Sequence, residues 1–136
     1  MTRPVLFADT GYWLALTNAD DQLHERAHVL ATTIPSRLVT TEAILLEIGD
    51  ALANQRFRVL AIALIADIRS DPDIEVISLS QELFETGFRL YAERADKGWS
   101  LTDCVSFVVM GERGIREALA ADQHFIQAGF RALLLE

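Results

Sequence analysis

The chain alternates short apolar runs with longer helical segments, and this alternation limits the folds that it can adopt. Five runs have the length of strands and cover residues 5–8, 37–40, 74–77, 115–120 and 131–135. Helical periodicity appears in seven segments. They are residues 12–16, a helix that residues 18–21 cap and that ends near residue 32, residues 41–54, 58–69, 81–95 and 101–112, and a short helix after residue 122. Strands that alternate with helices in this way build a parallel sheet covered on both faces. The sequence therefore predicts one α/β domain over residues 1–136.

Hydropathy and cysteine content indicate where the protein works. The longest apolar run, residues 59–66, is much shorter than the roughly 20 residues that a membrane-spanning helix needs. Residues 1–4 lead directly into the first apolar run without the pattern of a signal peptide. The single cysteine, Cys104, has no internal partner for a disulfide, which suits a reducing compartment. We therefore expect a cytoplasmic protein with no membrane segment.

The charge balance is acidic, with 12 basic and 20 acidic side chains and a net charge of −8. Affinity for a phosphate backbone comes mostly from Lys and Arg, so this balance by itself argues against nucleic-acid binding. A cluster of carboxylates that held divalent cations would account for part of the excess and would reverse the local charge. The positions of the acidic residues therefore matter more than their number.

Two aspartates lie where a strand is followed by a helix. Asp9 directly follows the first strand, and Asp122 follows the fourth strand and starts a short helix. Aspartate is among the best residues for an N-cap, which would explain either position without any chemistry. Open α/β sheets also bind their ligands at the carboxyl ends of parallel strands. Both residues are therefore candidate ligands for a metal or a phosphate.

Asp103 is the only charged residue between Lys97 and Glu112. It lies at the start of a helix that is apolar nearly all round and should therefore be buried. The spacing from Ser100 to Asp103 fits a capping box. A carboxylate at the mouth of a buried helix is nevertheless costly unless it is paired or holds a cation. We therefore interpret Asp103 as a functional residue.

The helix predicted for residues 41–54 carries three acidic residues, which a helical wheel separates. Glu42 and Asp50 point nearly opposite to the apolar face and should be solvated, whereas Glu47 lies at roughly a right angle to its centre. From that margin the Glu47 side chain can reach into a cleft beside the sheet. We therefore choose Glu47 as the fourth candidate.

Together these four positions predict a metal site. Three of them, Asp9, Asp103 and Asp122, lie at helix starts, which share one edge of a parallel sheet. Clustered carboxylates repel one another and would destabilise the fold unless they held a cation. Ligation by oxygen alone suits Mg²⁺ or Mn²⁺ rather than Zn²⁺.

Four short motifs also occur in a definite order along the chain. They are Phe7-Ala8-Asp9-Thr10, Thr40-Thr41-Glu42-Ala43-Ile44-Leu45-Leu46-Glu47, Ser100-Leu101-Thr102-Asp103-Cys104, and Ala121-Asp122-Gln123-His124-Phe125 followed by Gly129. At these distances they resemble the PIN-domain ribonucleases, above all the VapC-like toxins of bacterial toxin–antitoxin pairs. Each motif is weak alone, but the resemblance runs nearly from end to end.

This resemblance implies a single PIN-like domain with a five-stranded parallel sheet flanked by helices. It also implies an acidic pocket that binds one or two Mg²⁺ or Mn²⁺ ions and cleaves RNA internally, with an antitoxin protein as a partner. The family's acidic positions fall on Asp9, Glu47, Asp103 and Asp122. The expected chemistry is attack of metal-activated water on a phosphodiester.

Three further positions bear on this site. Thr10 and Ser100 fall near the acidic positions and would act as hydroxyls that orient a carboxylate or a water. At Ala120, two residues before Asp122, many relatives carry a hydroxyl residue instead. This departure leaves a second interpretation open, in which the chain is a catalytically weak or inactive PIN module that binds protein or RNA.

Residues 24–28 form a competing motif, His-Glu-Arg-Ala-His, which matches the H-E-x-x-H signature of zinc peptidases. The segment is short and lacks the third histidine of the metzincins, so we expect a surface helix instead. Two other Mg²⁺-binding classes fit poorly. A receiver domain would need a lysine near the end of the last strand, and a dehalogenase-type phosphatase would need a second aspartate two residues after Asp9.

Residues 59–66 are apolar on every side of their predicted helix, which is more than one face of a sheet requires. Deep burial of the helix would explain this composition. The alternative is that part of the helix lies in a homodimer interface or in an antitoxin-binding surface. We expect a homodimer, with an antitoxin as a further partner.

Overall fold

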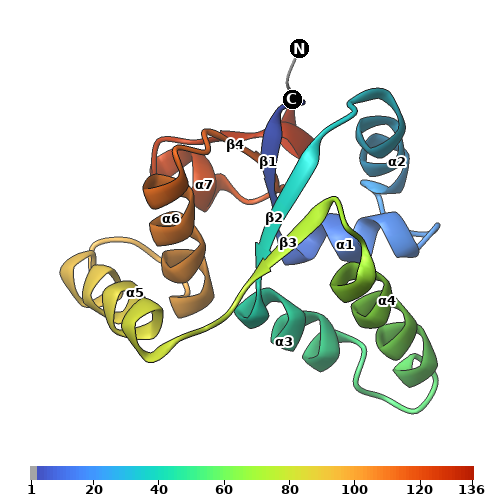
Figure 1. The fold of residues 1–136 in the computed structure, drawn as a ribbon, viewed down its shortest axis with the longest axis horizontal. Helices are drawn as coiled ribbons and strands as arrows, with labels where there is room; N and C mark the ends of the chain where they lie inside the picture. The colour runs from blue at the N-terminus through green and yellow to red at the C-terminus, as the bar shows by residue number, and fades with distance from the viewer. Residues whose placement is uncertain (1–2) are drawn as a thin grey trace.

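The computed structural model describes residues 3–136 and has a five-stranded sheet at its centre (Figure 1). Met1 and Thr2, at the start of the stretch without a signal-peptide pattern, lie outside the described residues. The strands are β1 (Val5–Ala8), β2 (Arg37–Thr41), β3 (Ile74–Ile77), β4 (Glu117–Leu119) and β5 (Arg131–Ala132). All neighbours pair in parallel, in the order β3-β2-β1-β4-β5. The predicted parallel sheet is confirmed.

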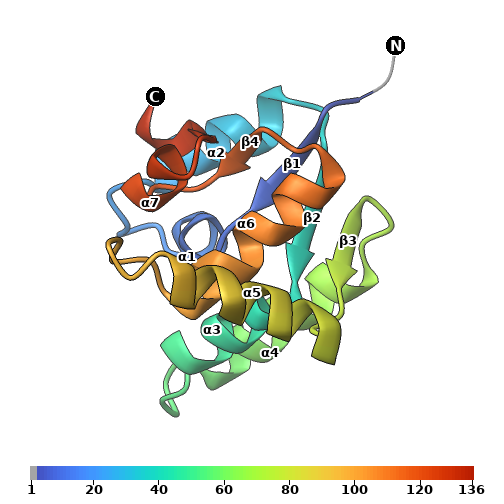
Figure 2. The same cartoon turned by 90° about the vertical axis from the view of Figure 1, so that its left-hand side faces the viewer.

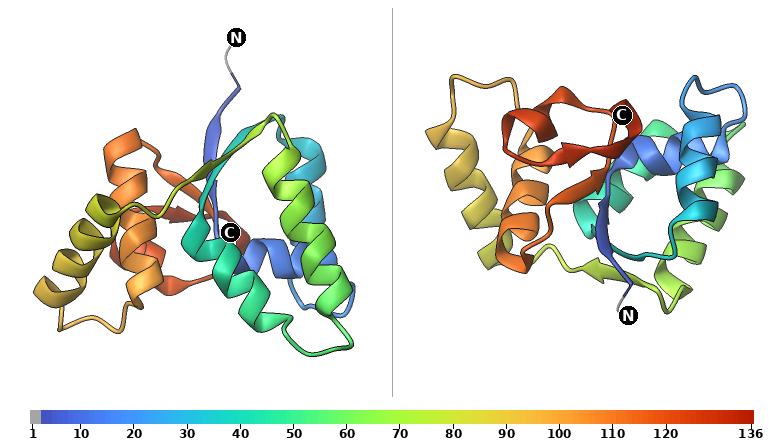
Figure 3. Two further views of the ribbon diagram at one scale, coloured as in Figure 1. Left: turned by 60° about the horizontal axis from the view of Figure 1, so that its bottom comes forward. Right: turned by 90° about the horizontal axis from the view of Figure 1, so that it is seen from above.

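Helices cover both faces of this sheet (Figures 1 and 3). On one side lie α1 (Thr10–Thr17), α2 (His24–Thr33), α3 (Glu42–Ala51) and α4 (Arg58–Ser70). On the other side lie α5 (Gln81–Glu93), α6 (Leu101–Arg113) and α7 (Gln123–Gln127), and the short 3₁₀ helix η1 (Leu133–Leu135) follows β5. Figure 2 shows α5 lying over α6, the helix against which it packs. Within residues 3–136, each helix is too short or too polar to cross a membrane.

The central strand β1 explains how the site is placed. Its residues Leu6, Phe7 and Ala8 are buried at consecutive positions because helices cover both faces of the sheet. From β1 the chain builds outward to β2 and β3, then crosses to the other side of β1 to form β4 and β5. The connections therefore diverge between β1 and β4, and ligands of open α/β sheets bind at such a point.

Several boundaries differ from the predictions, and α3, for example, ends at Ala51 rather than near Asn54. The second helix begins at His24 rather than after residues 18–21, because Asp21 accepts a hydrogen bond from the N–H of Leu23 (2.8 Å) in a turn instead of capping the helix. The strand predicted at 115–120 is confined to Glu117–Leu119. The strand predicted at 131–135 ends at Ala132, after which the N–H of Leu134 donates to the carbonyl of Ala120 (3.1 Å).

Deep burial does not explain the apolar composition of α4. Its residues Ala61, Leu64 and Ile68 pack into the core, but Val59 is 76% exposed and Ile62 is 62% exposed. One face of α4 is therefore covered and the other is open. A second apolar stripe, which the sequence analysis did not consider, consists of Phe84, Phe88 and Tyr91, stacked along the exposed side of α5.

Helices α5 and α6 lie close together at Gly87. A Cβ atom at this position would lie 2.7 Å from Cγ2 and 3.3 Å from Cα of Val105, a residue that is itself buried in α6. Contacts this short require the two helix backbones to separate. Because Gly87 has no side chain, α5 can pack closely against α6, the helix whose first turn carries Asp103.

We expect Gly87→Ala to lower the free energy of unfolding by about 1–2 kcal/mol, because overpacking against Val105 outweighs the higher helix propensity of alanine. Gly111→Ala is the matched control, since it lies in α6 with open space at the Cβ position. It should leave the stability unchanged or raise it. Urea unfolding of both variants measures the difference, and equal stabilisation by the two substitutions would contradict the close approach.

Candidate metal centre

Asp9 lies directly after β1 at the N-cap position of α1, and the residue is only 9% exposed. Its side chain makes no capping hydrogen bond to α1, so helix capping does not account for it. Its backbone N–H donates to the carbonyl of Leu119 at the end of β4 (3.1 Å). The residue therefore lies at the point where the connections of β1 and β4 diverge, and this favours the interpretation as a ligand.

Burial and neighbouring charges both affect the pKa of Asp9. Burial is the largest cause that raises this pKa, from 3.8 to about 7. The nearby backbone N–H of Thr10 opposes the increase, whereas the negative charges of Asp103, Glu47 and Asp122 add to it. All three of the other predicted carboxylates thus lie close enough to act on Asp9. Residues from four separate parts of the chain meet in one acidic cluster.

Glu47 reaches this cluster from α3, the helix that follows β2. Its carboxylate is partly buried and accepts a hydrogen bond from the hydroxyl of Thr10 (2.5 Å). The neighbouring acidic residues Glu42 and Asp50 are exposed, and Glu42 accepts a hydrogen bond from the N–H of Leu79 (2.6 Å) instead. The structure therefore agrees with the helical wheel on which of the three acidic residues are exposed and which is partly buried.

Asp103 lies in the first turn of α6 and is 8% exposed. It forms a complete capping box, in which its Oδ2 accepts from the N–H of Ser100 (3.1 Å) and its own N–H donates to the Ser100 hydroxyl (3.0 Å). The backbone of Ser100, rather than its hydroxyl, therefore contacts the carboxylate. The expected role of the Ser100 hydroxyl in orienting a carboxylate or a water stays a prediction.

Asp122 is the N-cap residue of α7, and its Oδ1 accepts a hydrogen bond from the N–H of His124 (2.9 Å). Its side chain is 39% exposed, so it lies at the rim of the cluster. Ala120 is fully buried and offers no hydroxyl to this carboxylate. Asp122 thus caps a helix, as its position in the sequence suggested, and also contributes charge to the cluster.

The sequence analysis missed His124 as a member of the site. Its Nδ1 lies 2.9 Å from Oδ2 of Asp103 and 3.3 Å from Oδ1 of Asp122. Within residues 3–136, Asp103, Asp122 and His124 form the one group of three whose possible ligand atoms all lie within 4.8 Å of one another, and Asp9 and Glu47 are not part of it. A histidine two residues after a candidate ligand, within the same motif, was the signal that could have identified it.

The donor set of this cluster fits a divalent cation. Carboxylate oxygens are ligands that suit Mg²⁺ and Mn²⁺. A buried carboxylate beside three others is electrostatically unfavourable, and a bound cation offsets this cost. The residues present are therefore suitable for holding Mg²⁺ or Mn²⁺.

The H-E-x-x-H motif does not form a comparable site. His24 and His28 share one face of α2, with ring centroids 6.4 Å apart. Nδ1 of His24 lies 2.8 Å from the carbonyl of Ala15, which links α2 to α1. In the part of the chain that the structure describes, these histidines join no group of three possible metal ligands. The motif therefore serves packing between two helices, as expected for a surface helix.

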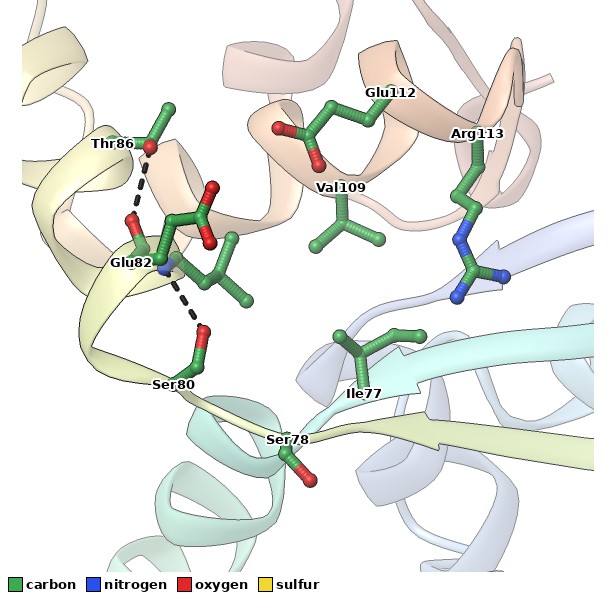
Figure 4. A pocket seen from close by; sticks show the side chains of 9 residues that line it. Ile77, Ser78, Ser80, Glu82, Thr86, Val109, Glu112 and Arg113 are labelled. Atoms are coloured by element: carbon green, nitrogen blue, oxygen red, sulfur yellow. Dashed lines mark hydrogen bonds between the residues drawn. The ribbon is translucent and has the colours of Figure 1, made fainter.

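A pocket between the start of α5 and the end of α6 lies apart from the carboxylate cluster (Figure 4). Three of its polar side chains already have partners. The Ser80 hydroxyl caps α5, and the Thr86 hydroxyl donates to the carbonyl of Glu82 (2.9 Å). Arg113 forms an ion pair with Glu75 (2.7 Å). None of the four predicted carboxylates lines this pocket, and the acidic cluster remains the candidate site.

The amino-acid sequence is similar to a protein-family model and to a curated protein. The family model of the PIN domain matches residues 6–131. The 23S rRNA-specific endonuclease VapC20 of Mycobacterium tuberculosis is 32% identical over 126 residues, which cover 93% of this chain and 95% of that protein.

Solved structures give the same result for the fold. The crystal structure of Mycobacterium tuberculosis VapC20, described as a sarcin–ricin loop cleaving toxin, matches with a TM-score of 0.86 and 31% identity, covering 93% of this chain and 97% of that chain. VapBC2 from Rickettsia felis, bound to a DNA fragment from its promoter, matches with a TM-score of 0.64 and 12% identity, covering 93% and 96%. The second likeness concerns the fold alone.

The raised pKa of Asp9 predicts a specific pH dependence of stability in the metal-free protein. Because the folded state favours the protonated acid, stability falls as pH rises from 3.8 to about 7 and stays low above that. The loss attributable to Asp9 is at most roughly 4 kcal/mol. Asp9→Asn should therefore be more stable than the wild type at pH 8 in EDTA, and the two should converge towards pH 4.

Thermal unfolding in EDTA at several pH values measures this difference. Asp50→Asn is the control, because Asp50 is an exposed residue of α3 outside the acidic cluster. Addition of Mg²⁺ or Mn²⁺ at pH 8 should stabilise the wild type and Asp50→Asn more than Asp9→Asn. If Asp9→Asn lost stability with rising pH as the wild type does, the burial of this charge would not be the cause.

Proposed function

The chain belongs to the PIN domain family, and on this premise we propose that it is a metal-dependent endoribonuclease and the toxin of a toxin–antitoxin pair. One observation carries the proposal for this chain. Four carboxylates, Asp9, Glu47, Asp103 and Asp122, converge where the connections of β1 and β4 diverge, and the charges of the last three all act on Asp9. This acidic cluster is where hydrolysis of RNA would take place.

The side chains of the cluster have different tasks in this proposal. A bound Mg²⁺ or Mn²⁺ would activate water and offset the charge of the phosphodiester. Asp9 and Asp103 are buried and provide ligands with little freedom to move. The hydroxyl of Thr10 holds the carboxylate of Glu47 in place. Asp122, at the more exposed rim, would complete the site on the side where the substrate enters.

The substrate that we propose is ribosomal RNA. VapC20, which shares 32% identity over nearly the whole chain, is a 23S rRNA-specific endonuclease. The net charge of −8 does not oppose this assignment, because bound divalent ions would offset the negative charge of the acidic cluster. Action on ribosomal RNA would take place in the cytoplasm.

We expect purified protein to cleave a sarcin–ricin loop RNA when Mg²⁺ or Mn²⁺ is present. Asp9→Asn, Glu47→Gln and Asp103→Asn should each lower the cleavage rate by at least about 100-fold, since each removes one charged ligand. Asp122→Asn should have a smaller effect, because its carboxylate is partly exposed. Gel analysis of end-labelled RNA measures the rates.

Asp50→Asn is the matched control for Glu47→Gln, since both residues lie on α3 but Asp50 points to solvent. Its rate should equal that of the wild type. Activity restored by Mg²⁺ or Mn²⁺, and not by Zn²⁺, would separate this chemistry from that of a zinc peptidase. A wild-type protein that bound this RNA but cut neither it nor total ribosomal RNA would favour an inactive PIN module instead.

We propose that the open face of α4 contacts a second copy of the chain. An antitoxin would be a further partner. Val59 and Ile62 expose more than half of their surface there, which is unfavourable for a free helix face. We expect Ile62→Glu to fold normally and to be monomeric by light scattering under conditions in which the wild type is a dimer. Glu substitution of Ile65 is less suitable, because that side chain is partly buried. An unchanged oligomer in Ile62→Glu would contradict this role of α4.

A further inference from the structure

His124 contacts two of the candidate ligands from a single position at the start of α7. Its backbone N–H donates to Oδ1 of Asp122 (2.9 Å), and its ring Nδ1 lies 2.9 Å from Oδ2 of Asp103. An ionised carboxylate can only accept a hydrogen bond, so Nδ1 is the donor in the contact with Asp103. One residue therefore links the first turn of α6 to the first turn of α7.

These contacts engage one oxygen of each carboxylate. Oδ2 of Asp103 accepts from both Nδ1 of His124 and the N–H of Ser100 (3.1 Å). Oδ1 of Asp122 accepts from the N–H of His124. Among the described residues, the other two oxygens, Oδ1 of Asp103 and Oδ2 of Asp122, have no hydrogen-bonding partner. They remain available for a cation.

The position of the ring does not depend on these contacts alone. Phe125, the next residue of α7, is completely buried, and Nε1 of Trp99 donates to Oε1 of Gln127 (3.0 Å). The second contact ties α7 to the loop that precedes α6. The ring of His124 lies against this loop at Gly98, where a Cβ atom would be 3.8 Å from Nε2. Helix α7 should therefore keep its place when the imidazole is removed.

We infer that His124 is a positioning residue, which orients Asp103 and Asp122 so that their free oxygens face the same divalent ion. The inference rests on the proposed function, because it concerns the same site. Hydrogen bonds behind metal ligands fix the orientation of those ligands, and their loss typically lowers metal affinity by about 10- to 100-fold. His124 acts in this way through Nδ1, while Nε2 is not required.

Three substitutions at this position separate the two ring nitrogens. His124→Asn places an amide nitrogen at the distance of Nδ1 from the backbone, whereas His124→Gln places it nearer the distance of Nε2. His124→Phe keeps a ring and removes both ring nitrogens. Calorimetric titration with Mn²⁺ alone measures metal affinity without RNA. We expect a 10- to 100-fold loss in His124→Phe and His124→Gln, and an affinity within about threefold of wild type in His124→Asn.

Cleavage of RNA gives a second readout. The Mn²⁺ concentration for half-maximal activity should rise in His124→Phe, while the KM for RNA stays unchanged. Wild-type Mn²⁺ affinity in His124→Phe, or rescue by His124→Gln rather than His124→Asn, would overturn the inference. Unfolding in EDTA controls for a loss of stability. If His124→Phe failed to fold, the Mn²⁺ affinities of His124→Asn and His124→Gln would decide whether Nδ1 positions the ligands. A wild type that neither bound Mn²⁺ nor cut RNA would refute the proposed function itself.

Discussion

The buried charge of Asp9 is the constraint on which the arrangement of the site depends. Asp9 follows the central strand directly, and its backbone is hydrogen-bonded to the neighbouring strand, so its carboxylate cannot move to solvent without disturbing the sheet. Burial and three neighbouring carboxylates disfavour its ionised form. Two ways remain to relieve this cost, which are protonation of the acid or binding of a cation. At neutral pH a bound divalent cation would offset this cost more effectively than protonation, and it would lie where the proposed hydrolysis needs a metal.

Each of the other carboxylates is held by a hydrogen bond, which for Asp103 and Asp122 lies at the start of its own helix and for Glu47 comes from α1. Thr10 holds Glu47, Ser100 holds Asp103, and the first N–H groups of α7 hold Asp122. Helix capping and metal binding are therefore compatible at Asp103 and Asp122, since a cap engages one oxygen and leaves the other free. At Asp9 capping is not observed, and the ligand interpretation stands alone. At α6 and α7, the hydrogen bonds that cap the helix thus also orient a candidate ligand.

Much of this arrangement could be predicted from the pattern of the sequence. Alternating apolar runs and helical segments were sufficient for the parallel sheet, since β1 and β3 have the predicted bounds. The helical wheel of α3 was sufficient to choose Glu47 over Glu42, because exposure on a regular helix follows from its period. The strand ends likewise placed Asp9 and Asp122 at one edge of the sheet.

Features that depend on contacts between distant segments could not be predicted in this way. The contact of His124 with Asp103 joins residues 21 positions apart, and the place of His124 beside Asp122 in the motif did not indicate that its ring reaches Asp103. The end of β5 depends on the hydrogen bond from Leu134 to Ala120 rather than on the apolar run that contains it. The open face of α4 has a similar origin, because composition does not say which side of an apolar helix is covered. In each case tertiary contacts decided the outcome.

The most direct test of the account is a crystal structure of the wild-type protein grown with Mn²⁺, in which anomalous scattering locates the metal. The account predicts a peak in direct contact with carboxylate oxygens of Asp9 and Asp103, with Glu47 or Asp122 alongside. If Mn²⁺ at saturating concentration left this cluster empty, or bound elsewhere with Asp9 protonated and unligated, the central claim that these carboxylates form a metal centre would be contradicted.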